Sequence, residues 1–357
     1  MKRVGWVLVA LLAIAVSARA DILWVANANA GNVSVIDTAK ANRVVAVIAL
    51  GAGSVPVEVA INAYYPEVYV TDAGRASLWV LSYVSKAVVR EIPLSIIAPF
   101  GLAVMPLGEK VYVGNADGGF TAGIISVVAT RTMRETSTID ISAQGLTGID
   151  LALTPVRATT LYIACNGTDT MAGLNTATNA LRGAPFPVAF NTPISRPFAI
   201  GLRPDNGFVY VCDDDPAGNV AEIVALDVPT LTPMIIPMGA ASRCTDIAFH
   251  PTQRRAYVPT GGGGRVRIMD TFVNTFITNV FNVPAGALPT KAAFNERGTL
   301  GMFTEQTGAG VCLVQTMANI VQGGVIATGA QPFGCAIAAV TYDPVGARAK
   351  QRRQSRR

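Results

Sequence analysis

Seven segments of this chain share one pattern: PVEVAIN (residues 56–62), PFGLAVM (99–105), GIDLALT (148–154), PFAIGLR (197–203), CTDIAFH (244–250), PTKAAFN (289–295) and PFGCAIA (332–338). Each opens with Pro or a replacement for it, and a small residue follows four positions later: Ala60, Ala103, Ala152, Gly201, Ala248, Ala293 and Ala336. A small side chain there lets innermost strands crowd around a narrow axis. An open sandwich of seven hairpins has no need of such a column. We therefore expect seven equivalent strands around one axis.

A second pattern follows each of these segments except the last, and it also precedes the first. An aromatic or apolar residue and a β-branched one recur as Trp24-Val25, Tyr69-Val70, Tyr112-Val113, Tyr162-Ile163, Tyr210-Val211 and Tyr257-Val258, with a weaker copy near Met302-Phe303. Polar or Gly-rich turns and short alternating strands come next, which is typical of antiparallel sheet. A repeat of 40–50 residues indicates stacked units. The sequence therefore predicts an all-β, seven-bladed β-propeller with four antiparallel strands per blade.

The two ends of the repeat complement each other. After residue 20 the chain begins with the second strand of a blade, Ile22–Ala26, and it ends with a first strand, 334–340. We expect these strands to pair and close the ring, which removes exposed sheet edges. The copies around Asn175 and Thr316 lack the Asp that usually follows the third strand, so irregular rims are expected there.

The repeat resembles a known family. Tyr69-Val70-Thr71-Asp72 and the segment NVSVIDTA (residues 32–39) are similar to the YVTN-repeat β-propellers, over essentially the whole chain after residue 20. This resemblance implies an exported protein of the surface-layer or periplasmic type. It implies little about the ligand, because one fold serves many functions.

The termini predict export. Residues 1–20 combine a basic start, thirteen apolar residues and the small-x-small site Ala18-Arg19-Ala20, which is the layout of a signal peptide cleaved before Asp21. Thirteen residues fall short of the ~20 that span a bilayer, and no later stretch is long enough. We expect a propeller over 21–342, a basic disordered tail over 343–357, and a periplasmic or secreted monomer without a transmembrane segment.

The charge distribution argues against nucleic-acid binding by the propeller body. Nine of the 28 basic residues lie in the signal peptide or the tail, which leaves 19 basic against 23 acidic residues elsewhere. A nucleic-acid surface needs a basic patch or stripe. No cofactor is predicted either: His250 is the one histidine, Cys-x-x-Cys-His is missing, and no Gly-rich phosphate loop opens a helix. His250 precedes Pro251 and is expected in a turn.

A charged column carries the ligand-site hypothesis. Two residues past each segment's first residue come Glu58, Gly101, Asp150, Ala199, Asp246, Lys291 and Gly334. We expect Glu58, Asp150, Asp246 and Lys291 to meet near the mouth of the central channel. Such a ring either holds a cation through oxygen ligands or lines a wet, partly neutralised channel. Whether a metal binds is left open.

Five cysteines, Cys165, Cys212, Cys244, Cys312 and Cys335, occur in a chain predicted to enter an oxidising compartment. Cys212 has two candidate partners in the repeat geometry. Cys165 lies on an equivalent strand with the opposite orientation, and Cys244 replaces the first Pro of the next innermost strand. A pair near the crowded axis is easier to bring within ~7 Å than one farther out, so Cys212–Cys244 is predicted over Cys165–Cys212.

These observations favour an exported binding scaffold that contacts an unknown protein or small-molecule ligand at the channel mouth and loops. Catalysis is not predicted. Two alternatives stay open: a lactonase-like propeller hydrolase with Glu58, Asp150 and Asp246 as ligands of a channel metal, and a structural surface-layer or adhesion component.

Overall fold

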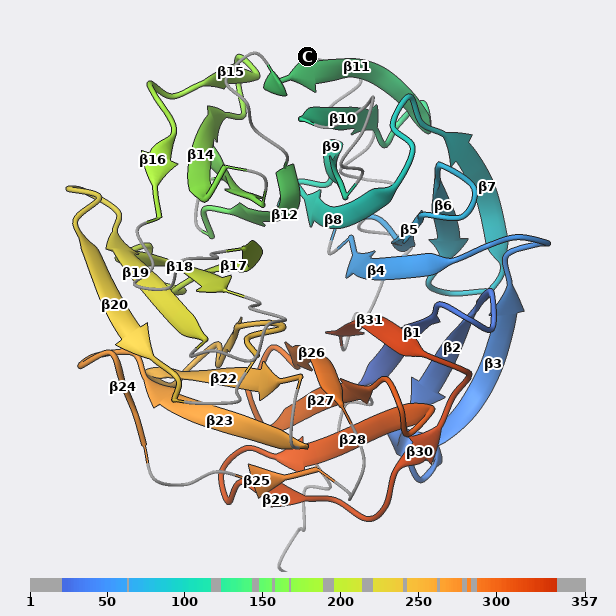
Figure 1. Cartoon of the computed structure of the whole chain (residues 1–357). Coiled ribbons are helices and arrows are strands. Elements are labelled where there is room, and N and C mark those ends of the chain that lie inside the picture. The colour runs from blue at the N-terminus through green and yellow to red at the C-terminus, as the bar shows by residue number, and fades with distance from the viewer. Residues whose placement is uncertain are drawn as a thin grey trace, which may run out of the picture.

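The computed structural model describes residues 21–338 except residues 63, 117–122, 143–147, 156–157, 167, 189–195, 214–220, 240–242, 262–263, 278–280 and 284–287. The predicted signal peptide and tail lie outside the described residues. The described part contains 31 β-strands and one short 3-10 helix, η1 (Thr38–Lys40). The strands form seven antiparallel sheets around a central axis (Figure 1), which confirms the predicted seven-bladed β-propeller.

Each blade runs from an innermost strand at the channel to its outer strand or strands at the rim. Blade 1 contains β31 (Pro332–Ala338), β1 (Ile22–Asn27), β2 (Asn32–Asp37) and β3 (Arg43–Ala49). Blade 2 contains β4 (Pro56–Ile61), β5 (Glu67–Asp72), β6 (Ser77–Ser82) and β7 (Val88–Pro93). Blade 3 contains β8 (Pro99–Val104), β9 (Lys110–Asn115), β10 (Ile124–Ala129) and β11 (Arg134–Asp140). Blade 4 contains β12 (Gly148–Leu153), β13 (Thr160–Cys165), β14 (Thr170–Asn175) and two short outer strands, β15 (Ala180–Leu181) and β16 (Phe186–Pro187).

The last three blades follow the same order. Blade 5 contains β17 (Pro197–Leu202), β18 (Phe208–Asp213), β19 (Glu222–Asp227) and β20 (Pro233–Pro237). Blade 6 contains β21 (Ala248–Phe249), β22 (Arg255–Thr260), β23 (Arg265–Asp270), β24 (Thr275–Phe276) and β25 (Phe281–Asn282). Blade 7 contains β26 (Pro289–Phe294), β27 (Leu300–Glu305), β28 (Gly310–Gln315), β29 (Ile320–Val321) and β30 (Ile326–Ala327). Two short strands thus replace the outer strand in blades 4 and 7, where irregular rims were expected, and also in blade 6.

The ring closes between the two ends of the chain. Strand β31 pairs antiparallel with β1, from Ile22 opposite Ala338 to Asn27 opposite Pro332. Figure 1 shows β31 next to β1 on the channel side of blade 1. This confirms the predicted closure, although the strand begins at Pro332 instead of Gly334, and residue 340 lies outside the described residues.

Packing against the neighbouring strand is a second reason why small residues are needed in this column, and the sequence pattern alone did not indicate it. Each small residue lies directly opposite the bulky residue of the next strand, for example Ala60 opposite Tyr69 and Ala336 opposite Trp24. Cross-strand partners share one face of a sheet, so a large side chain at Ala60 would compete with Tyr69 for the same space. Crowding between innermost strands also contributes, because a Cβ on Gly201 would lie 2.8 Å from the carbonyl oxygen of Ile247 in the neighbouring blade.

Buried apolar side chains hold neighbouring blades together, and a repeated hydrogen bond supplements this packing. In three blades the second-strand Tyr hydroxyl donates to an Asn in the outer hairpin of the next blade: Tyr112 to Asn179 (2.9 Å), Tyr210 to Asn274 (2.6 Å) and Tyr257 to Asn319 (2.8 Å). All three Asn residues have φ between 53° and 56°, a left-handed conformation that Asn tolerates better than most residues. The described part of the chain contains no helix long and apolar enough to cross a membrane.

The cysteines of blades 5 and 6 lie together. Cys212 in β18 is joined to Cys244, which precedes β21, with a Cα–Cα separation of 5.4 Å. Cys165, Cys312 and Cys335 are buried free thiols. Burial raises the pKa of the Cys165 and Cys312 thiols to about 12 each, so these groups stay protonated and unreactive in the native protein.

We expect peptide mapping of the native protein under non-reducing conditions to recover Cys212 and Cys244 in one linked peptide. Alkylation after denaturation without reductant should label Cys165, Cys312 and Cys335. A link from Cys212 to Cys165, or an alkylated Cys212, would contradict this prediction.

Candidate ligand site in the central channel

The innermost strands contain a bulge at the level of the charged column. In blade 2, Pro56 is paired with Asp72 and Val59 with Val70, so two residues of β4 oppose one residue of β5. The same irregularity occurs at this level in β8, β12, β17, β26 and β31. A bulge redirects side chains and releases backbone groups from the ladder. It therefore explains how this column comes to face the channel.

Two threonines opposite these bulges form hydrogen bonds with backbone N–H groups that the bulges release from the strand ladder. Each hydroxyl accepts a hydrogen bond from the N–H of a charged residue and donates one to a carbonyl of the next blade. The bonds are Glu58 N to Thr71 Oγ1 (3.0 Å), Thr71 Oγ1 to Phe100 O (2.9 Å), Lys291 N to Thr304 Oγ1 (3.0 Å) and Thr304 Oγ1 to Phe333 O (2.8 Å). Thr71 and Thr304 thus hold Glu58 and Lys291 in place while tying neighbouring blades together.

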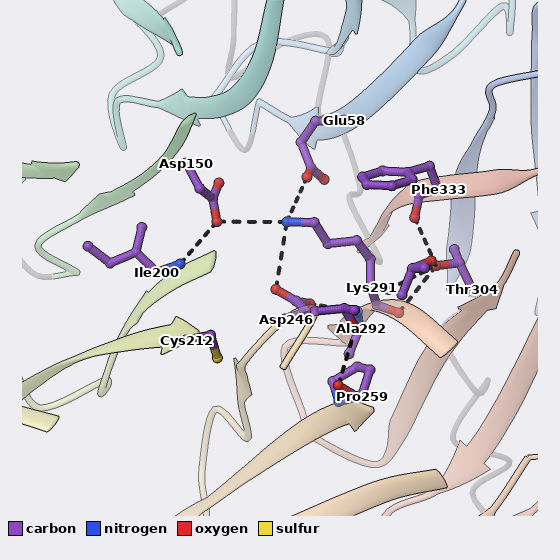
Figure 2. Close-up of polar contacts among 12 residues, drawn as sticks. Glu58, Asp150, Ile200, Cys212, Asp246, Pro259, Lys291, Ala292, Thr304 and Phe333 are labelled. Carbon is purple, nitrogen blue, oxygen red and sulfur yellow. Dashed lines mark hydrogen bonds and ion pairs between the residues drawn. The ribbon is translucent and has the colours of Figure 1, made fainter. Parts of the chain in front are cut away.

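The four predicted site residues meet at one point. The Lys291 Nζ lies 3.0 Å from Glu58 Oε2, 3.7 Å from Asp246 Oδ1 and 3.8 Å from Asp150 Oδ2 (Figure 2). All four side chains are about nine-tenths buried, with exposed fractions of 9–12%. We refer to these four residues as the channel cluster. It joins blades 2, 4, 6 and 7 and carries three carboxyl groups against one ammonium.

Backbone donors orient two of the carboxyl groups. Asp150 accepts hydrogen bonds from Leu151 N (3.0 Å) and, in the next blade, from Ile200 N (3.1 Å). Asp246 accepts one from Ala292 N of the next blade (2.8 Å). Hydrogen bonds of this kind favour the ionised carboxylate.

Burial and charge act on the pKa values in opposite directions. Burial raises the pKa of the Glu58 carboxyl to about 7, and the Lys291 ammonium offsets only part of this effect. Burial also raises the pKa of Asp246 against the same opposing charge. For Lys291, burial lowers the pKa of the ammonium, but the three carboxyl groups outweigh it and hold that pKa well above its usual value.

Small residues alternate with the acidic ones around the ring. Gly334, Gly101 and Ala199 occupy the column in blades 1, 3 and 5, between the carboxyl groups of blades 2, 4 and 6. A Cβ on Gly101 would lie 2.8 Å from the Cα of Asp150, and one on Gly334 would lie 2.6 Å from the Cα of Glu58. The backbone of each of these two acidic residues therefore fills the space beside its small neighbour, and Lys291 of blade 7 supplies the one positive charge.

The sequence analysis missed an aromatic cluster at this end of the channel. Phe333, Phe100 and Phe198 directly precede the small residues of blades 1, 3 and 5. Phe100 packs edge-to-face on Phe198 with centroids 5.8 Å apart, and on Phe333 at 5.5 Å. These blades are not adjacent in the ring, so the contacts join innermost strands that are separated by another blade. A triplet of Pro, Phe and a small residue, repeated at residues 99–101, 197–199 and 332–334, was the sequence signal that could have indicated this aromatic cluster.

A cavity of about 160 Å³ borders the channel cluster. Its lining includes all four charged residues, together with apolar Leu102 and Ile200 and the thiol of Cys335. This volume has room for several water molecules or a small ligand. Within the described ranges, no group of three or more His, Cys, Asp or Glu side chains is arranged to hold a metal ion. The Lys291 ammonium instead lies among the carboxyl groups that the hydrolase alternative assigns to a metal.

Comparisons with known proteins place the chain among β-propellers. No family model matches, and no curated protein matches. A protein of unknown function from Desulfotomaculum acetoxidans is similar in structure, with a TM-score of 0.69, 18% identity, and coverage of 89% of this chain and 98% of that one. Hydrazine synthase from Kuenenia stuttgartiensis has a TM-score of 0.65, 15% identity, and coverage of 78% and 88%. The dihydro-heme d1 dehydrogenase NirN has a TM-score of 0.60, 13% identity, and coverage of 88% and 74%. These likenesses show the fold alone.

Proposed function

We propose that this chain is an exported binding scaffold of the YVTN-repeat type, which binds a cationic group of a ligand or partner at the mouth of its central channel. The observation that carries the proposal is the channel cluster, in which three carboxyl groups surround a single ammonium beside a cavity. Burying charge without full compensation is costly, and strongly perturbed groups gather at functional sites.

The excess of negative charge selects the class of ligand. With all four groups ionised, the channel cluster carries two uncompensated negative charges, so a cation is attracted and an anion is repelled. The half-buried rings of Phe100, Phe198 and Phe333 suit the same ligand, because aromatic faces attract cations such as ammonium groups. No observation favours the hydrolase alternative, since a metal ion bound to these carboxyl groups would first have to displace Lys291.

Calorimetric titration at pH 8 and constant ionic strength tests this proposal with methylammonium, choline and calcium chlorides as probes. We expect saturable binding of methylammonium or choline by the wild type, whereas binding of calcium alone would favour the metal-dependent hydrolase alternative. Glu58→Gln should weaken it by about 10–100-fold, because a charge-assisted hydrogen bond contributes about 1.5–3 kcal/mol. Asp140→Asn removes an exposed carboxylate from the outer strand β11 and should leave binding unchanged.

Two results would refute the proposal: no binding by the wild type at ~100 mM of any probe, or equal weakening by both substitutions. The surface-layer or adhesion alternative is distinguished by cell fractionation. It requires the protein at the cell surface, whereas a periplasmic location excludes it.

A further inference from the structure

The channel cluster brings together more acidic groups than it can keep ionised. The titratable groups that the innermost strands present at this level are Glu58 from β4, Asp150 from β12, Asp246 from the segment before β21, and Lys291 from β26. At the same level β8, β17 and β31 present Gly101, Ala199 and Gly334. Cys335 comes directly after Gly334. Burial, together with the charges of Glu58 and Asp246, raises the pKa of its thiol well above the usual value, so the thiol stays neutral.

Among the residues that the structure describes, Lys291 is the one cationic side chain that forms ion pairs with these three carboxyl groups. Apolar Leu102 and Ile200 line the cavity beside the cluster, and the rings of Phe100, Phe198 and Phe333 lie one residue nearer the start of the innermost strands. Three carboxylates and one ammonium in such a setting amount to two buried, unpaired negative charges. Buried groups relieve this penalty by neutralisation, which for a carboxylate means protonation.

Glu58 has the weakest backbone hydrogen bonding of the three carboxyl groups, although its ion pair with Lys291 is the shortest. Asp150 accepts two backbone hydrogen bonds, and Asp246 accepts one of 2.8 Å from the next blade. Glu58 accepts a single long backbone bond, 3.3 Å from Val59 N, in addition to its ion pair. Hydrogen bonds to the ionised form lower a carboxyl pKa, so the proton settles on Glu58. The rise of the Glu58 pKa to about 7 agrees with this assignment.

We propose that the channel cluster is a proton-for-cation exchange site, in which Glu58 carries a proton when no cation is bound and releases it to water when a monovalent cation binds. This inference rests on the proposed function. The exchange conserves charge, because one proton leaves the carboxyl group as one monovalent cation enters. By linkage, cation affinity then rises about tenfold per pH unit below pH 7 and levels off above it.

The first experiment locates the proton. Carbon-13 NMR of the full chain, labelled at the glutamate carboxyl carbons, follows each group from pH 4 to 9. A second buried glutamate, Glu305 in blade 7 beside Cys312, provides the matched control, since burial raises its pKa to about 7 as well. We expect two carboxyl signals that titrate near pH 7. Glu58→Gln removes one of them, and Glu305→Gln removes the other.

The second experiment measures the exchange. Calorimetry with methylammonium chloride in phosphate and in MOPS, two buffers that carry no primary ammonium group and differ in heat of ionisation, gives the protons released per cation bound. Release should be about 0.9 at pH 6, 0.5 at pH 7 and 0.1 at pH 8. Glu305→Gln should match the wild type, whereas Glu58→Gln should release none.

The outcomes separate this inference from the proposed function. If Glu58 titrates below pH 5, or if methylammonium binds without releasing protons, the exchange is refuted while cation binding stands. If Glu58 titrates near pH 7 but none of methylammonium, choline and calcium binds, the proposed function fails and the exchange fails with it.

Discussion

Replacing Lys291 by methionine is expected to cost about 3–5 kcal/mol of folding free energy at pH 8. The substitution keeps an unbranched chain of similar length but leaves Glu58, Asp150 and Asp246 converging without a positive charge. Removing one partner of a buried ion pair has a cost of this size, which is a large part of the ~5–15 kcal/mol that stabilises a typical domain.

The loss should depend on pH. Burial already raises the pKa of Glu58 and Asp246 above their unfolded values, and removing the ammonium raises both further. A carboxyl group whose folded pKa is raised contributes stability at low pH and loses it as pH rises through that pKa. The variant should therefore be least stable at pH 8 and recover as pH falls towards 5.

Urea unfolding at pH 5 and pH 8, followed by the fluorescence of Trp24 and Trp79, measures this effect. Lys291→Met combined with Glu58→Gln should lose less stability at pH 8 than Lys291→Met alone, because one buried charge is gone. Equal stability of the single variant at the two pH values would show that the channel cluster does not depend on its ammonium.

Removing residues 332–357 is expected to abolish cooperative folding. This truncation deletes β31, which pairs with β1 and completes blade 1. It also removes the carbonyl groups of Phe333 and Ala338, which accept hydrogen bonds from Thr304 of blade 7 and Tyr83 of blade 2. The remaining chain would expose one edge of β1 and open the channel between blades 7 and 2, and unpaired sheet edges favour aggregation.

Circular dichroism during urea unfolding, together with size-exclusion chromatography, tests the role of β31. Removing only residues 343–357 is the matched control and should leave the unfolding midpoint unchanged. A synthetic peptide of residues 332–342, added to the longer truncation, should restore a cooperative transition. If the longer truncation unfolds at the same midpoint as the full chain, strand closure does not stabilise the ring.

The channel cluster was predictable to the extent that the repeat sets its register. Glu58, Asp150, Asp246 and Lys291 stand at equivalent positions of equivalent strands, so a common level around the axis followed from counting residues. The bulges were not predictable, because they arise from the hydrogen-bond register between strands. The contacts of Phe100 with Phe198 and Phe333 were missed because these residues belong to non-adjacent blades, and a one-dimensional pattern does not indicate contacts between such blades.

The sequence by itself determined the seven blades, the strand that closes the ring, and the residues that share one level of the channel. All three follow from a repeat whose period and alternation reflect local backbone geometry. Only the tertiary structure decided that Lys291 reaches three carboxyl groups at once, and that a small residue faces each bulky second-strand residue. These features depend on distances between strands of different blades, and those distances are set by how side chains pack around the axis.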